Sequence, residues 1–171
     1  LDTVARFPAT APDRVCLVAA LELTDLQDRR RRLIRARELG FRFPVLVHPS
    51  AVVEPGAALG AGIVVGALSV IDRDASLGDF CCLEPGVLVG ADASVGSNNH
   101  LGAGVTVGRR ARLGQDNQLG VNATVAEGVA VGDGQTIEPG ALVASDLLAP
   151  MLIPFPAQPD AAVVFDEVSH A

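Results

Sequence analysis

Every sixth residue from Val47 to Val143 is Val, Leu or Ile, which gives seventeen consecutive positions without an exception. An α-helix would scatter these side chains around its axis, because its period is about 3.6 residues. A flat strand alternates every second residue and leaves this longer period unexplained. A fixed six-residue repeat is typical of a parallel β-helix, in which stacked coils carry one repeat on each flat face.

Most of these hexads begin with the aliphatic residue, continue with Gly, Ala or an acid, and have a small residue at the fifth position, as in residues 101–106 (LGAGVT). We expect the first residue to point inward, the fifth to fill the remaining interior, and glycine to permit a tight backbone between faces. Three hexads make a coil of eighteen residues, so residues 47–148 would form between five and six coils. At about 4.8 Å between strands, the rod would be roughly 27 Å tall.

One column of the expected interior is polar. At intervals of eighteen residues, the fifth position reads Ile63, Cys81, Asn99, Asn117 and Gln135. Buried amides are costly unless they are paired, so we expect the three amide side chains to pair with one another in a ladder that fixes the register. The functional alternative is that they form the polar edge of a cleft.

Composition and charge exclude several classes of protein. The 171 residues are 49% apolar, which suffices for one rod and a small additional piece. Residues 47–171 carry four Arg against fourteen acids, and such an acidic rod would repel a nucleic acid backbone. No apolar run reaches the roughly 18 residues that a membrane span needs. Three cysteines without metal-like spacing favour a cytoplasmic location.

The first 46 residues predict the remnant of an α/β lobe. Residues 14–21 (RVCLVAAL) are typical of a buried strand, and Thr24 with Gln27 forms a capping box for a helix that Gly40 would end. The helix would bury a thin apolar stripe that consists of Leu26, Leu33, Ile34 and Leu39.

The arginines of this helix, at positions 29–32, 35 and 37, would cover its remaining surface. A basic run of this kind is usually a solvated face, and the functional alternative is attraction of a phosphate-bearing substrate. At the other end, the repeat stops after Val143, and four prolines between Leu148 and Pro159 cannot pair in a regular ladder. We therefore expect residues 149–171 to form a tail that caps the last coil, and its last dozen residues either pack as a final strand at 161–165 or wander.

The junction at residues 40–51 (GFRFPVLVHPSA), which leads directly into the hexads, resembles that of the sialic acid O-acetyltransferase family. This family includes the bacterial UDP-4-amino-sugar N-acetyltransferases, and the resemblance covers residues 14–157. It implies a left-handed β-helix, which is an exception to the right-handed crossover rule. It also implies an α/β lobe that holds a nucleotide sugar, acetyl-CoA as co-substrate, and a homotrimer with active sites between neighbouring rods.

The chain departs from this family at the expected catalytic base. The family's base is a His in a Glu-His-Asp stretch, nine residues before a second His that precedes a Leu. The second His matches His100, so the base position is Ala91, followed by Asp92. A positioned base is typically worth about 10²- to 10⁴-fold in rate, so activity is expected to be impaired unless His100 replaces it, with Asp92 orienting groups beside it. The alternative is that His100 is a structural histidine.

The resemblance also implies contacts with acetyl-CoA. Arg109 aligns with the glycine whose backbone N–H meets the thioester oxygen. The cluster of Arg109, Arg110 and Arg112 could meet phosphates of the cofactor, or simply offset nearby acids. The closing Gly-x-Pro-Ala segment reads PFPA here and supplies Pro156 and Ala157. Asn117 of the amide column is the residue that would touch the pantetheine arm.

No metal is expected. Hexapeptide-fold carbonic anhydrases bind zinc through three His, of which two lie close together in sequence. The histidines of this chain, His48, His100 and His170, lie 52 and 70 residues apart.

Two functions follow from the sequence. The first is an acetyl-CoA-dependent acetyltransferase that acts on a nucleotide-linked sugar or amino sugar. The second is a non-catalytic trimeric scaffold or binding subunit that kept the rod and lost the base. The acceptor sugar, the choice between nitrogen and oxygen, and the acyl group stay open.

Overall fold

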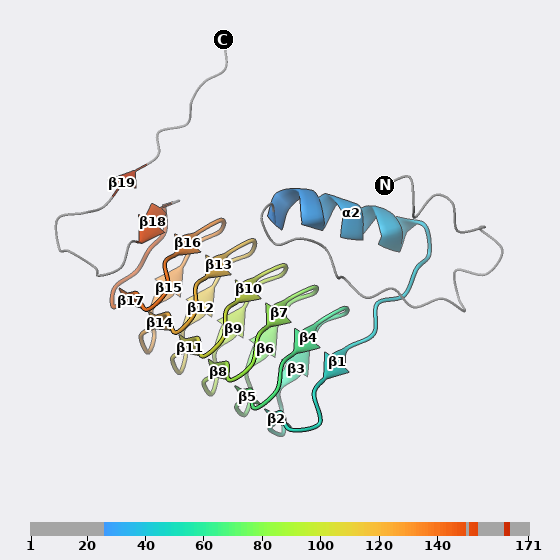
Figure 1. Cartoon of the computed structure of the whole chain (residues 1–171), viewed down its shortest axis with the longest axis horizontal. Coiled ribbons are helices and arrows are strands. Elements are labelled where there is room, and N and C mark those ends of the chain that lie inside the picture. Colours follow the sequence, from blue (N-terminus) through green and yellow to red (C-terminus); the bar gives the residue numbers. More distant parts are fainter. Residues whose placement is uncertain (1–25, 150, 154–162, 165–171) are drawn as a thin grey trace, which may run out of the picture.

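The computed structural model describes residues 26–149, 151–153 and 163–164. It shows one helix, α2 (Leu26–Glu38), followed by a parallel β-solenoid of about five turns (Figure 1). This confirms the predicted mainly β fold built from hexapeptide repeats. The predicted strand at 14–21 and the capping residue Thr24 lie outside the described residues.

The solenoid is a prism with three parallel sheets, and each coil contributes one short strand to each sheet. Sheet 1 contains β1 (Leu46–Val47), β4 (Val64–Val65), β7 (Cys82–Leu83), β10 (His100–Leu101), β13 (Gln118–Leu119) and β16 (Thr136–Ile137), and then β18 (Met151–Ile153) and β19 (Val163–Val164). Sheet 2 contains β2 (Val52–Val53), β5 (Val70–Ile71), β8 (Leu88–Val89), β11 (Thr106–Val107), β14 (Thr124–Val125) and β17 (Leu142–Val143). Sheet 3 contains β3 (Ala58–Leu59), β6 (Ser76–Leu77), β9 (Ser94–Val95), β12 (Arg112–Leu113) and β15 (Ala130–Val131).

The register between coils is eighteen residues, as the hexads predict. Leu101 pairs with Leu119 in sheet 1, and Val107 pairs with Val125 in sheet 2. The leading aliphatic residues from position 65 to position 143 are all buried inside the prism. Val47 and Val53 belong to the first coil and stay 41% and 37% exposed, because no described strand pairs with that coil on its other side.

Glycine serves the coil at two different hexad positions. At the second position it allows close stacking, because a Cβ on Gly102 would lie 2.9 Å from the Leu119 carbonyl oxygen and the Val121 nitrogen of the next coil. The turn between faces is made at the fourth position, where every sixth residue from 56 to 140 has a positive φ. This position looks variable in the sequence, but Gly, Asn and Asp dominate it, and these residues tolerate left-handed backbone best.

Helix α2 ends as predicted. Gly40 has a φ of 87°, its N–H donates to the Arg37 carbonyl at 2.9 Å, and the Phe41 N–H donates to the Ala36 carbonyl at 3.2 Å. These are the two hydrogen bonds of a Schellman cap. The predicted apolar stripe is partly wrong, because Ile34 and Leu39 are exposed. The buried residues of the helix are Leu26, Arg29, Leu33 and Ala36.

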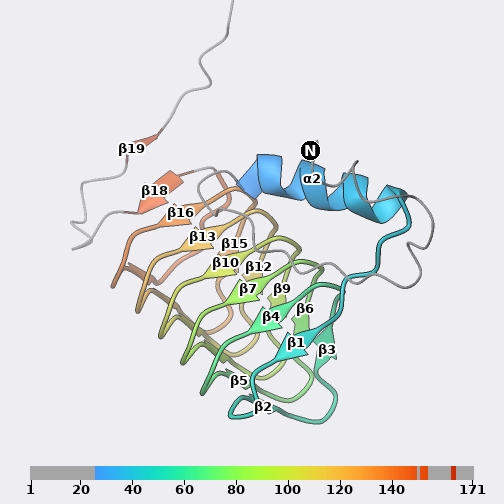
Figure 2. The same cartoon turned by 45° about the vertical axis from the view of Figure 1, so that its right-hand side comes forward.

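The helix lies along the edge where the chain passes from sheet 3 back to sheet 1, and it crosses several coils (Figure 2). Its apolar contact is a small cluster in which the Phe43 and Phe80 rings meet edge to face with centroids 4.9 Å apart. Aromatic pairs favour this arrangement. The cluster also contains Leu33, Ala36 and Phe41. The helix is thereby fixed to the side of the solenoid.

The end of the solenoid differs from the prediction. The prolines do not end the ladder, because β18 pairs in parallel with β16 and places Ile153 beside Ile137. Leu147 likewise forms a bridge with Val131. Both intervals are sixteen residues, so the last coil is two residues shorter than the others. The sequence predicts a final strand near 161–165, and β19 pairs antiparallel with β18 there. The proposed division into segments 1–46, 47–148 and 149–171 stays a prediction.

The two glycine positions should differ in how strongly a substitution lowers the stability of the solenoid. Gly102→Ala should lower the free energy of unfolding by about 1–3 kcal/mol, because the added methyl group meets backbone atoms that cannot yield without separating two coils. Gly128 is the matched control: it has a φ of 73°, and a Cβ added there would have no atom within 4 Å, so Gly128→Asn should change stability by no more than about 0.5 kcal/mol. Urea denaturation measures both variants. Equal losses would contradict the assignment of the second position to coil stacking.

Candidate functional site

The most unusual side chain on the outside of the prism is His100. It is the first residue of β10 and pairs in register with Cys82 and Gln118, while Leu101 points into the core. The His100 Nε2 atom lies 3.0 Å from the Glu84 Oε1 atom, and the Glu84 Oε2 atom accepts the Ala103 N–H at 3.0 Å. His100 is only 8% exposed, and its Nδ1 atom has no hydrogen-bond partner among the described residues.

A carboxylate held by a backbone N–H and touching an imidazole is an arrangement that can accept and pass on a proton. Buried polar atoms are normally satisfied, so an unpartnered ring nitrogen calls for an explanation. Glu84 was not singled out from the sequence. The repeat length could have indicated this contact, because residues about one coil apart lie side by side and Glu84 precedes His100 by sixteen positions.

The other predicted site residues lie on a different edge, where the chain passes from sheet 2 to sheet 3. Asp92 is exposed there and has a φ of 60°, so it occupies one of the left-handed turn positions. Arg109 is also exposed and lies eighteen residues after Ala91. Neither Asp92 nor Arg109 has an ion pair among the described residues, while the neighbouring Arg110 pairs with Glu127. His100 lies on sheet 1, the face opposite this edge, so a single chain does not bring His100 together with Asp92.

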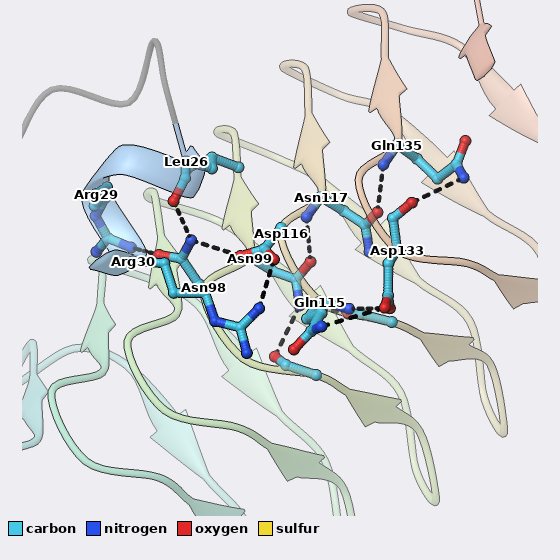
Figure 3. A network of polar contacts seen from close by, with 12 residues as sticks. Leu26, Arg29, Arg30, Asn98, Asn99, Gln115, Asp116, Asn117, Asp133 and Gln135 are labelled. Carbon is cyan, nitrogen blue, oxygen red and sulfur yellow. Dashed lines mark hydrogen bonds and ion pairs between the residues drawn. The ribbon is translucent and has the colours of Figure 1, made fainter. Parts of the chain in front are cut away.

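The amide column lies inside the solenoid, as expected, but its hydrogen bonds differ from the predicted ladder (Figure 3). The Asn99 Oδ1 atom accepts the Asn117 backbone N–H at 2.9 Å, and the Asn117 Oδ1 atom accepts the Gln135 backbone N–H at 2.6 Å. The side-chain oxygens of Asn99 and Asn117 therefore accept from the backbone of the next coil, and the Gln135 amide donates to the Asp133 carbonyl at 3.1 Å. Asn117 is 0% exposed, so its side chain does not reach the outer surface where a pantetheine arm would bind.

The arginines of helix α2 make more structural contacts than the sequence indicates. Arg29 is buried, and its guanidinium donates to the Phe80 carbonyl at 3.0 Å and to the Asn98 side-chain oxygen. Asn98 in turn donates to the Leu26 carbonyl at 2.6 Å and to Asp116 at 2.8 Å (Figure 3). The prediction of a fully solvated basic face is wrong at this position.

The other arginines of α2 also have partners within the chain. Arg30 pairs with Asp116 at 2.9 Å, and Arg37 pairs with Asp79 at 2.8 Å, so both anchor the helix to the solenoid. The remaining pairs lie on the helix itself and join Arg31 and Arg32 to Asp28, and Arg35 to Glu38. This pairing favours a structural role over the capture of a phosphate-bearing substrate.

The two cysteines of the solenoid are poor nucleophiles. Both are free, and burial raises the pKa of the Cys81 thiol to about 11. Burial also raises the pKa of Cys82, although the positive charge of Arg29 opposes this effect. Neither side chain is therefore a thiolate near neutral pH.

Two further observations concern the described part of the chain. It contains no group of three or more His, Cys, Asp or Glu side chains that could hold a metal ion. None of its helices has the length and apolar character to cross a membrane. The predicted cofactor contacts Pro156 and Ala157 lie outside the described residues.

A three-sheet prism of eighteen-residue coils defines the class of hexapeptide β-helix proteins, and solved structures of this class include nucleotide-sugar acetyltransferases. A His-to-Asn variant of perosamine N-acetyltransferase from Caulobacter crescentus, in complex with CoA and GDP-perosamine, is 31% identical with a TM-score of 0.56, and the match covers 78% of this chain and 64% of that one. The acetyltransferase domain of PglB from Neisseria gonorrhoeae FA1090 is 28% identical with a TM-score of 0.61, and the match covers 91% and 74%. The same domain in complex with acetyl coenzyme A is 29% identical with a TM-score of 0.56, and the match covers 86% and 72%.

The chain is thus a structural homologue of the nucleotide amino-sugar N-acetyltransferases of the hexapeptide β-helix family, which confirms the resemblance seen in the sequence. It spans 64% of the length of the perosamine enzyme. No protein-family model and no curated protein matches the sequence.

Proposed function

We propose that this protein is an acetyl-CoA-dependent acetyltransferase that acylates a nucleotide-linked amino sugar. Solved relatives carry CoA with GDP-perosamine, or acetyl coenzyme A, which supports the class of both substrates. The observation that carries the proposal is the contact between His100 and Glu84, which we call the Glu84–His100 pair, at 3.0 Å on the outside of sheet 1. This pair supplies proton-accepting groups in a chain that has an alanine, Ala91, at the position where the resemblance places the catalytic base.

In the proposed reaction, the sugar amine attacks the carbonyl carbon of the thioester. A nitrogen–carbon bond forms, the carbon–sulfur bond breaks, and CoA leaves. The proton lost by the amine passes to the Glu84–His100 pair and then to the departing thiolate, so that free CoA and the N-acetyl sugar are the products. The exposed Arg109 would offer its backbone N–H to the thioester oxygen, and Asp92 would orient groups on the same edge.

The proposed assembly is a homotrimer, and the outer surface of sheet 2 is the face that best fits an interface. The outward residues of its strands are uncharged: Val52, Val70, Leu88, Thr106, Thr124 and Leu142. The adjoining edge exposes Leu68 and Val121. Contiguous apolar surface of this kind marks interaction sites. Since His100 lies on the outer face of sheet 1 and Arg109 lies on the opposite edge of the same protomer, a site that uses both would be shared between neighbouring protomers.

This assembly can be tested by adding a charge to sheet 2. Leu88→Arg should shift the protein from a trimer toward the 17.5 kDa single chain, because a guanidinium buried in the interface loses its hydration without gaining a partner. Ser76→Arg is the control, since it adds the same charge at the equivalent outward position of sheet 3. Sedimentation equilibrium measures both masses. A wild-type mass of one chain, or equal dissociation of both variants, would contradict the proposed interface.

A second candidate function is supported by one specific observation. Ala91 occupies the position where the resemblance places the catalytic His, and an alanine side chain cannot transfer a proton. A protein of this kind could serve as a non-catalytic trimeric scaffold or binding subunit.

The role of His100 separates the two candidates. His100→Ala should lower kcat by about 10²- to 10⁴-fold, because the pair that accepts the proton is broken. His48→Ala is the control: that residue is exposed and its side chain bonds only to Ser50 among the described residues, so turnover should stay near the wild-type rate. CoA release from acetyl-CoA with GDP- or UDP-linked 4-amino sugars is followed by chromatography, which separates free CoA from acetyl-CoA directly. No CoA release from the wild type, together with no binding of acetyl-CoA, would favour the scaffold.

The missing base can also be restored. Ala91→His should raise kcat by about 10-fold or more if the position is aligned correctly, because an imidazole would return to the acetyl-transfer site. The edge accommodates long side chains, since the residues one coil away on either side are Arg73 and Arg109. Ala91→Gln is the control of similar size that cannot act as a base near neutral pH. A rate that rises equally in both variants, or in neither, would show that this position lies outside the reacting centre.

A further inference from the structure

The two members of the Glu84–His100 pair are unequally accessible. The His100 side chain is 10% exposed, whereas the Glu84 side chain is 38% exposed. The Nε2 atom of His100 is directed at Glu84, and its Nδ1 atom is buried. A substrate that approaches from solvent therefore meets the carboxylate of Glu84 before either ring nitrogen.

With Glu84 taken as an ionised carboxylate, the contacts assign the donor of the hydrogen bond between the two side chains. The Glu84 Oε2 atom accepts the Ala103 N–H, and an ionised carboxylate has only acceptor positions. The contact between Nε2 and Oε1 then requires the imidazole to donate, so its proton is on Nε2. A histidine in this state stabilises the orientation of the carboxylate and offers no accessible basic nitrogen to the substrate.

We propose that Glu84 is the catalytic residue that touches the sugar amine, and that His100 is a positioning residue that holds Glu84 in place. This inference rests on the proposed acetyltransferase function and assigns the proton acceptor within it. The bound ammonium group first loses one proton to solvent, so that the neutral amine attacks the thioester. As the nitrogen–carbon bond forms, the attacking nitrogen becomes acidic and its second proton moves to a Glu84 oxygen. The carbon–sulfur bond then breaks, and the proton passes from Glu84 to the CoA thiolate. The carboxylate also selects for a substrate that carries an amine, because an ammonium group forms a charge-assisted hydrogen bond with it.

Isosteric variants distinguish this assignment from one in which His100 is the base. Glu84→Gln keeps the shape and removes the proton acceptor, so kcat should fall by about 10²- to 10⁴-fold. His100→Gln places an amide N–H near the position of Nε2 and keeps the donor to Glu84, so its loss should stay below about 10-fold. His100→Asn places its amide nearer the position of Nδ1 and should lose more activity than His100→Gln. If His100 were the base, both histidine variants would be equally inactive, and that result would overturn the assignment.

A binding measurement tests Glu84 without relying on turnover. Calorimetry compares a nucleotide-linked 4-amino sugar with the matching 4-hydroxy sugar in the wild type and in Glu84→Gln. The variant should bind the amino sugar at least about 10-fold more weakly and the hydroxy sugar equally well. Equal affinities in both proteins would overturn the role of Glu84. If the wild type shows the amine preference but releases no CoA, the proposed acetyltransferase activity fails while the role of Glu84 in amine recognition stands.

Discussion

The structure depends on one constraint, which is that each coil must lie directly on the next. Backbone N–H groups of one coil donate to carbonyls of the following coil, as when His100 donates to Asn117 and Gly102 donates to Leu119, both at 2.9 Å. Stacking brings the leading aliphatic side chains into continuous buried columns, and the burial of these columns stabilises the prism. A residue inserted within a strand would turn the following side chains of that face outward, so length can vary only between faces, as in the last coil, which is two residues shorter and continues the ladder.

This constraint explains how much of the fold could be predicted. The aliphatic period alone gives the three faces, the eighteen-residue register and the direction of the core side chains. It does not reveal the fourth hexad position, because that position is defined by backbone conformation and accepts Gly, Asn and Asp as well as Leu68, Phe80 and Arg110. It also fails where the period changes, as in the shortened coil between Ile137 and Ile153, which continues the ladder despite its flanking prolines.

Contacts across the surface were harder to predict for a different reason. Arg29 bonds to Asn98, 69 residues away, because the helix lies on an edge of the prism, and no periodicity indicates which edge a helix selects. A run of arginines gives no indication of which one is buried, since burial is decided by the apolar cluster around Phe43 and Phe80. The Glu84–His100 pair is an intermediate case. Its residues are about one coil apart, so the repeat permits the contact but does not require it.

The positions of the candidate residues bear on how the proposed acetyltransferase could react with Ala91 at the expected base position. His100 lies on the face of the prism opposite the edge that carries Ala91 and Arg109, so a site built from all three would depend on the proposed assembly. Glu84, His100 and Ala103 lie on neighbouring coils of one chain, and their contacts form without a partner. A proton acceptor within a single protomer is held by the same stacking that holds the core. The rigidity of the solenoid, more than any one side chain, would then keep the carboxylate in a position to react.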